Sequence, residues 1–429
     1  GATITNNGTQ TGFGRTGTVN WQTTPKTATF TAVSGEGYFC NTTGGSFEVD
    51  LPTGSAGDIV SVQDYNNTFD SNSLIVDPPA GQKINGGTNG GKITLDTEGE
   101  GVTLVYVDST VGWRSIHQSS FADVGADAQF VTATGGTITT SGDFKIHTFT
   151  GPGTFCVSCA GNACGSNTVS YLVVAGGGAG GGSNRQSRGG SAAGAGGFRE
   201  GKTPCTPYTA SPLVAPAGLP VSATGYPITV GSGGTGGSGT GGTSTSGANS
   251  VFSTITSAGG GAGASPSSCE HAAGGSGGAG RAGGPAGKAG NTPPVSPPQG
   301  NPGGNGGPCG PTFATGGGGG ATAAGGNAPS APVAGAGGAG ATTHITGSPV
   351  AYAGGGGGSI WGYTTGGTIG AGGTGGGGAG VQGPSNGNAG TANTGGGGSG
   401  AAGGPSEPPA NVTGGNGGSG IVVIRYKFQ

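Results

Sequence analysis

The sequence predicts an all-β protein: a β-sandwich-like module, a short β linker segment and a C-terminal bundle of polyglycine-II strands. Short runs of alternating polar and apolar residues, separated by turn residues, occupy most of the first 175 positions. Residues 176–420 then contain 85 Gly and 22 Pro, a Gly content about five times the usual level. Only 7% of the chain is charged, against about 25% in an average domain. This composition excludes coiled coils, and the absence of a long apolar run predicts no membrane insertion.

The β-sandwich-like module is expected over residues 18–118, after an N-terminal connector at 1–17. Residues 27–33 alternate between polar and apolar side chains, as in a half-buried strand. Similar runs follow at 46–51, 58–62 and 102–107. Turn residues about every 8–12 positions predict a sandwich or a meander. Trp21 and Trp113 flank the module and fit a core or an interface better than a ligand site.

A second β segment, at 129–175, follows a linker at 119–128 and leads into the glycine-rich region. Its last strand, 169–175, is strongly apolar and runs directly into a glycine run. The chain closes with a strand of the same character at 421–429. We expect these two strands to pair and to bring together the two ends of the glycine-rich region, 176–420.

Glycine runs separated by segments rich in Pro, Ser, Thr and Asn predict a packed bundle in region 176–420. A polyproline-II-type strand has three residues per turn and no internal hydrogen bonds, so its N–H and C=O groups can bond to neighbouring strands. A strand surrounded on all sides would need Gly at every position, whereas a surface strand could carry Ala, Ser or Thr. The alternative is a flexible Gly/Ser linker.

Charge and cysteine spacing point to no cofactor and no metal site. Residues 1–143 hold five Lys/Arg and fourteen Asp/Glu, and residues 144–429 hold nine and three. Basic residues this sparse do not form the clustered surface that nucleic acid requires. Cys156, Cys159 and Cys164 could begin a zinc site, but no second Cys pair or nearby His pair completes it. Disulfides and free thiols both remain open.

No catalytic constellation emerges from the sequence, so we expect no enzymatic activity. Residues 196–203 match the phosphate-loop pattern, but Pro204 and Pro207 follow where that motif needs a helix. After Asp143 the only acids are Glu200, Glu270 and Glu407. Paired carboxylates for glycoside hydrolysis would therefore have to lie in the first module, which has no cleft pattern.

Segments spread over nearly the whole chain resemble a known family. They lie at 171–178, 194–200, 226–231, 250–261, 291–294 and 418–429, with 35–60 and 104–113 in the first module. The first six look like the glycine-rich C-terminal domain of tail fibres from marine tailed bacteriophages, cyanophages especially. The other two are similar to a β module upstream in such fibres.

This resemblance implies a virion appendage: a homotrimeric tail fibre, next to other phage tail proteins, with the glycine-rich bundle at its host-facing end. In such a trimer Trp21, Phe30 and Trp113 would lie partly at the interface. The leading hypothesis is an adhesin that binds a host surface polysaccharide or outer-membrane protein. The alternatives are a structural filament without a receptor and, less favoured, a polysaccharide depolymerase.

Receptor recognition is expected in the loops at the tip of the bundle, because glycine strands carry too few functional groups to discriminate ligands. Ile360, Trp361 and Tyr363 form one candidate group, since exposed aromatic side chains are typical binding anchors. The guanidinium groups of Arg185 and Arg188 could pair with acidic sugars or phosphates. His271 and His344 are weaker candidates. The alternative for Trp361 is burial against the side of the bundle.

Overall fold

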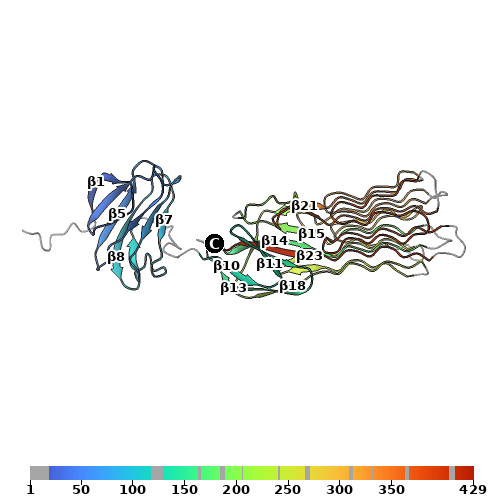
Figure 1. The fold of residues 1–429 in the computed structure, drawn as a ribbon, viewed down its shortest axis with the longest axis horizontal. Helices are drawn as coiled ribbons and strands as arrows, with labels where there is room; N and C mark the ends of the chain where they lie inside the picture. The colour runs from blue at the N-terminus through green and yellow to red at the C-terminus, as the bar shows by residue number, and fades with distance from the viewer. Residues whose placement is uncertain are drawn as a thin grey trace, which may run out of the picture. The chain divides into compact units, whose positions relative to one another are not determined.

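The computed structural model contains strands and connecting segments, and no helix, in its described part. The described residues are 19–116, 129–162, 166–183, 189–204, 206–239, 242–265, 271–308, 313–330, 332–362, 367–404 and 411–429. They confirm the all-β prediction and include no helix that could span a membrane. The chain divides into two compact units after Gln129, which Figure 1 colours from blue to red along the sequence.

The first unit contains two sheets that share one hydrophobic core. Its five-stranded sheet has the order β1 (Asn20–Lys26), β3 (Glu36–Cys40), β5 (Ile59–Asp64), β8 (Gly101–Asp108) and β9 (Gly112–Ser115). Its four-stranded sheet has the order β2 (Phe30–Thr31), β4 (Phe47–Asp50), β6 (Leu74–Asp77) and β7 (Ile93–Leu95). Alternating side chains of both sheets fill the space between them, as in a sandwich.

The strands of the first unit are not connected as a meander, which was one of the two expected arrangements. Strands β1, β3 and β5 are parallel neighbours, and so are β2, β4 and β6. The chain therefore passes between the two sheets three times, as in a solenoid. Each pass adds one strand to each sheet: β1 and β2, then β3 and β4, then β5 and β6. Antiparallel pairing appears only afterwards, with β7, β8 and β9. Of the two expected arrangements, sandwich or meander, the structure has the sandwich. The strand order was not predicted, because alternation identifies the buried face of a strand but not the strand that pairs with it.

Trp113 belongs to the core of the first unit. Its side chain is fully buried, its Nε1 donates a hydrogen bond to Gln82 Oε1 at 3.2 Å, and its ring packs edge-on against Tyr106. The expectation that Trp113 lies partly at an interface between copies is therefore corrected. Trp21, in contrast, is 41% exposed.

The second unit contains three sheets, built from strands at both ends and in the middle of its sequence. The first has the order β10 (Val131–Thr134), β13 (Gly153–Ala160), β18 (Gly225–Thr229), β19 (Ser250–Phe252) and β20 (Ile255–Ser257). The largest has the order β11 (Thr137–Ser141), β12 (Phe144–Phe149), β23 (Ile421–Lys427), β14 (Thr168–Val174), β15 (Phe198–Gly201) and β16 (Val214–Ala215), and β17 (Leu219–Pro220) also pairs with β14. Strands β21 (Ala341–Thr343) and β22 (Val350–Tyr352) form a hairpin.

Strands β14 and β23 pair, as the sequence predicted. The pairing is antiparallel, with Val173 opposite Val422. Successive residues of β14 enter different cores: Val173 packs in one hydrophobic cluster and Leu172 in another on the other side of the sheet. Both strands are therefore apolar at nearly every position, as expected for strands buried on both faces. This central pair holds the two ends of the glycine-rich region together.

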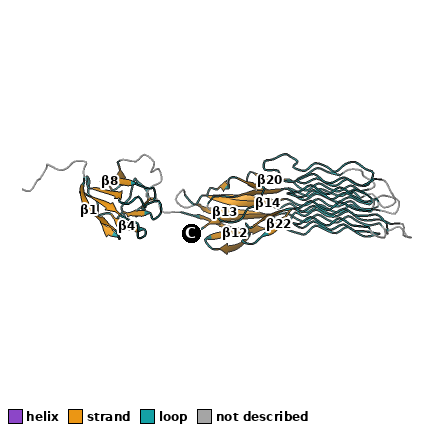
Figure 2. Cartoon of the chain, turned by 90° about the horizontal axis from the view of Figure 1, so that it is seen from above, coloured by secondary structure: helices purple, strands orange, loops and turns teal. Residues whose placement is uncertain are grey.

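Beyond β14, β15 and β23 the chain extends into long, nearly parallel segments, which Figures 1 and 2 draw as a bundle without conventional strands. In segment 176–181 successive N–H groups donate to three different neighbours, and the order repeats every three residues. Gly176 and Ala179 donate to Ala248 and Thr245, Gly177 and Gly180 to Gly418 and Gly415, and Gly178 and Gly181 to Gly194 and Ser191. A period of three is that of a polyproline-II-type helix. The lateral hydrogen bonding that the sequence predicted is therefore present.

Three further segments of the bundle lie around segment 176–181, in the directions where its N–H groups do not donate hydrogen bonds. A Cβ on Gly176, Gly177 or Gly178 would overlap the backbone of Ser232, Gly396 or Gly261, respectively. Glycine is required at these positions because neighbouring strands lie within contact of the missing side chain.

The expectation that an enclosed strand needs Gly at every position was too strict. Ala179 and Ala193 are fully buried inside the bundle, and so is Ser191. A buried serine side chain can take the place of a backbone acceptor: the Oγ of Ser191 accepts a hydrogen bond from Ala264 N at 2.7 Å. At Ser191 a hydroxymethyl group is therefore accommodated with its oxygen in a hydrogen bond.

Candidate functional site

Trp361 lies at the far end of the bundle, meaning the end away from β14, β15 and β23. It follows the segment 354–358, which leaves β22 and runs to that end (Figure 1). Its ring packs edge-on against Phe313, with centroids 5.7 Å apart and an interplanar angle of 83°. The side chain is half-buried, and its Nε1 is buried with no acceptor among the described residues. Because buried N–H groups normally have a partner, an acceptor that reached this nitrogen would gain a hydrogen bond.

Ile360 is fully buried, so its prediction as an exposed receptor contact is corrected. It packs with Ala314, Ala328 and Ala334 in a small hydrophobic cluster between segments of the bundle. Its N–H donates to Val381 O at 3.0 Å. Side chains of adjacent residues in an extended segment point in different directions, which explains why Ile360 is enclosed while Trp361 is partly accessible.

The two predicted histidines are not gathered with Trp361. His271 is only 6% exposed, and its Nε2 lies 2.6 Å from Ala286 O, so its prediction as an exposed contact is also corrected. His344 is half-buried beside the β21–β22 hairpin, where its N–H donates to Thr209 O. That hairpin lies with the sheets, at the end of the bundle next to β14, β15 and β23 (Figure 1).

Three further predicted contacts, Tyr363, Arg185 and Arg188, lie outside the described residues. The partner of Trp361, Phe313, was not predicted. It stands alone between a Pro-rich segment and a glycine run, and no spacing rule links it to a residue 48 positions later.

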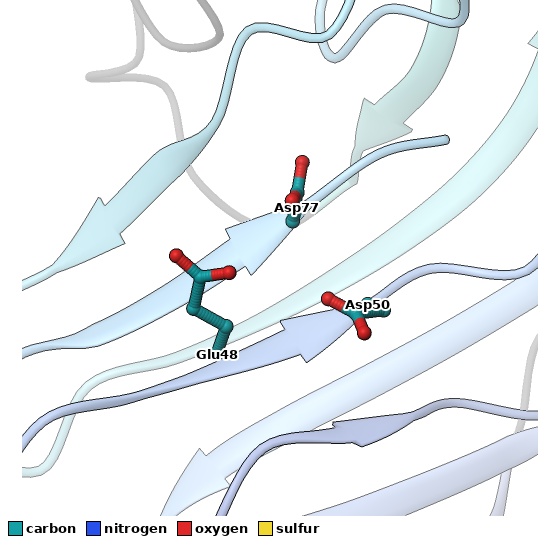
Figure 3. Close-up of side chains that lie close together, drawn as sticks. All are labelled: Glu48, Asp50 and Asp77. Atoms are coloured by element: carbon teal, nitrogen blue, oxygen red, sulfur yellow. The ribbon is translucent and has the colours of Figure 1, made fainter. Parts of the chain in front are cut away.

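A cluster of three carboxylates lies on the four-stranded sheet of the first unit (Figure 3). Glu48 and Asp50 are on β4, and Asp77 on β6 is directly opposite Asp50. Their oxygens lie within 4.8 Å of one another. Lys92 Nζ is 2.9 Å from both Glu48 Oε1 and Asp77 Oδ2. The hydrogen bond to Glu48 raises the pKa of Lys92 most, and the hydrogen bond to Asp77 raises it next. A metal ion would have to displace this ammonium group, so the cluster forms an ion-pair network.

The sequence contains a signal for this cluster that was not used. Glu48 and Asp50 are two residues apart in a strand, so their side chains share one face. Asp77 follows Val76 at an equivalent outward position in the next parallel strand. The pairing of β4 with β6 was the missing information.

The cysteines and the phosphate-loop match do not assemble a site in the described residues. Cys156 and Cys159 are free thiols on β13, and Cys164 lies outside the described part. Residues 198–201 of the phosphate-loop match form β15, and Lys202 Nζ lies 5.3 Å from the centre of the Tyr208 ring. A strand in this position does not supply the loop and helix N-terminus that cradle phosphates.

Comparison with known proteins agrees with the architecture of the second unit. A family model described as a glycine-rich domain matches residues 148–427. No curated protein matches the chain. The matched range covers most of the chain and includes the bundle together with β14 and β23, the strands that close it. The chain therefore belongs to the family of proteins with this glycine-rich domain.

Proposed function

We propose that the protein is a fibre or adhesin that recognises a surface receptor with groups at the far end of its glycine-rich bundle. The observation that supports this most is the half-buried Trp361 against Phe313, with an indole N–H that has no acceptor in the described structure. The accessible part of this aromatic ring is suited to a ligand that offers an apolar face, as a sugar or a protein side chain does.

The bundle itself supports a role as a rigid support. Its backbone groups bond between neighbouring segments in three directions, and 85 of the positions in 176–420 are glycine and so lack a side chain. Such a structure holds its ends in fixed positions while carrying little chemistry on its sides. Recognition would then depend on the few larger side chains where the segments end.

The resemblance to phage tail fibres adds the finer part of the proposal: a homotrimeric virion appendage next to other tail proteins. In this role the protein would bind a host polysaccharide or outer-membrane protein and catalyse no reaction.

The test is direct binding of the fluorescently labelled full chain to a panel of marine bacterial strains, cyanobacteria included. We expect binding to at least one strain, loss of that binding in Trp361→Ala combined with Tyr363→Ala, and an unchanged melting temperature. Ile369→Ala is the matched control, because Ile369 is an exposed apolar residue of the same bundle.

Three results would count against the proposal. Binding to no strain would favour a structural filament. Unchanged binding in the double variant would move the site away from Trp361. Release of reducing sugars from cell envelopes would favour a depolymerase.

A further inference from the structure

Three aromatic side chains form a row on the outer face of the five-stranded sheet of the first unit. Trp21 lies on β1, Phe39 on β3, and Tyr65 directly follows β5. The rings of Trp21 and Phe39 are stacked with centroids 4.9 Å apart, and Phe39 and Tyr65 are 6.4 Å apart, edge to face. Trp21 is 41% and Tyr65 53% exposed. We call these three residues the aromatic row.

The sheet beneath the aromatic row holds it in place. Tyr38 and Cys40 point into the core, so Phe39 between them points outward. A Cβ on Gly37 would lie 2.9 Å from Cδ2 and Cε3 of Trp21, which means that the indole lies against the backbone of β3. Only glycine leaves this space. Rings held by a sheet lose little conformational freedom when a ligand binds.

The sheet positions next to the aromatic row on β3 and β5 carry no charge. Outward positions on β3 and β5 hold Gly37, Phe39, Ser61 and Gln63. The hydroxyl of Ser61 bonds to that of Thr103 at 2.8 Å. Acidic residues lie near the Tyr65 end of the row: Asp64 directly precedes Tyr65, and Gln63 Nε2 donates to Gly99 O at 2.8 Å and to Glu100 O at 3.4 Å. These acids would repel an anionic ligand, so a ligand that matches this face would be neutral.

Amide and hydroxyl groups also lie beside the Tyr65 end of the row. The N–H of Tyr65 donates to Cys40 O, which places the loops after β3 and β5 side by side. There, Asn66 Nδ2 donates to Thr43 Oγ1 at 3.1 Å, and Asn41 Oδ1 accepts from Thr43 N at 3.1 Å. Aromatic faces combined with a few fixed amide and hydroxyl groups are typical of small-ligand recognition.

We propose that the aromatic row binds a neutral oligosaccharide. The C–H face of a pyranose ring would stack on the exposed parts of Trp21 and Tyr65, with Phe39 stacked between them as support, and sugar hydroxyls would bond to the neighbouring amides. A second copy of this chain is the main competitor. The exposed parts of three such side chains offer roughly 300 Å², whereas a stable protein interface buries about 800 Å² on each partner.

This inference is independent of the proposed function, because the aromatic row and Trp361 lie in different units. The test is affinity gel electrophoresis of the full chain through gels that contain hydroxyethyl cellulose, mixed-linkage β-glucan or galactomannan, with alginate as the acidic comparison. Trp21→Ala combined with Tyr65→Ala removes the row, and Val33→Ala is the control, since Val33 is 55% exposed and outside it. Thermal melts and sedimentation accompany each variant.

We expect at least one neutral polysaccharide to retard the wild type and the control, and the double variant to lose at least tenfold in apparent affinity. If the double variant unfolds, Tyr65→Ala alone should still weaken binding, since Tyr65 lies at the exposed end of the row. Retardation by alginate alone, or by none of the polysaccharides, overturns the proposal. So does a double variant that binds normally but changes its state of association, which would assign the face to contact between copies.

Discussion

Substitution of Gly318 tests whether tight backbone contact is what requires glycine in the bundle. A Cβ built on Gly318 would lie 1.8 Å from the carbonyl oxygen of Ala193, about half an ordinary contact distance. The two segments would have to separate, because the obstacle is backbone and cannot rotate away. The affected region includes the hydrogen bonds from Gly318 N to Gly356 O at 2.8 Å and from Gly356 N to Ala193 O at 3.0 Å.

The expected cost of Gly318→Ala follows from these contacts. Overpacking costs about 1–3 kcal/mol, and each weakened hydrogen bond adds about 0.5–1.5 kcal/mol. The reduced entropy of the unfolded chain offsets about 0.4–1 kcal/mol. We therefore expect a loss of about 2–5 kcal/mol in the free energy of unfolding, and a larger loss for Gly318→Val.

The matched control is Gly307→Ala, also at a buried glycine of the bundle. There the nearest atom to a new Cβ is 3.4 Å away, an ordinary contact. This change should be neutral or stabilise the protein by about 0.4–1 kcal/mol. Ser330→Val, at an exposed position, should also be mild. Thermal melts of the purified variants measure all four changes. Equal melting temperatures for Gly318→Ala and Gly307→Ala would refute the contact argument.

Three further predictions concern titration, thiol chemistry and assembly. Burial lowers the pKa of His147, whose ring nitrogens contact Gly135 O and Tyr426 Oη. The neutral form of His147 should therefore contribute its full stabilisation above about pH 6.5, and this stabilisation should decrease as the pH falls below that value. Denaturation of His147→Phe should show a weaker loss than the wild type between pH 7 and 5. Burial raises the pKa of Cys40 to about 12, so iodoacetamide should label exposed Cys156 much faster than Cys40, as peptide mapping would reveal. Sedimentation should show a trimer, and a stable monomer at micromolar concentration would contradict the assembly proposed from the resemblance.

Much of the fold could be predicted because its determinants are local or compositional. The strongly apolar sequences of β14 and β23 indicated strands, and their positions at the two ends of the glycine region indicated that they pair. The site was less predictable. Ile360 and Trp361 are adjacent in sequence, yet one is enclosed and the other half-buried, because packing at the end of the bundle decides which direction is open.

The sequence by itself determined that the chain is all-β, that its second part is a glycine bundle with lateral hydrogen bonds, and where β14 and β23 begin and end to within a residue or two. These properties follow from alternation, from the space that glycine leaves and from the three-residue period of an extended strand. Only the tertiary structure decided that β1, β3 and β5 are parallel neighbours, that Trp113 is core while Trp21 joins an exposed aromatic row, and that Trp361 meets Phe313. Each of these depends on contacts between residues far apart in the chain, and a pattern read along one strand carries no information about the strand that packs against it.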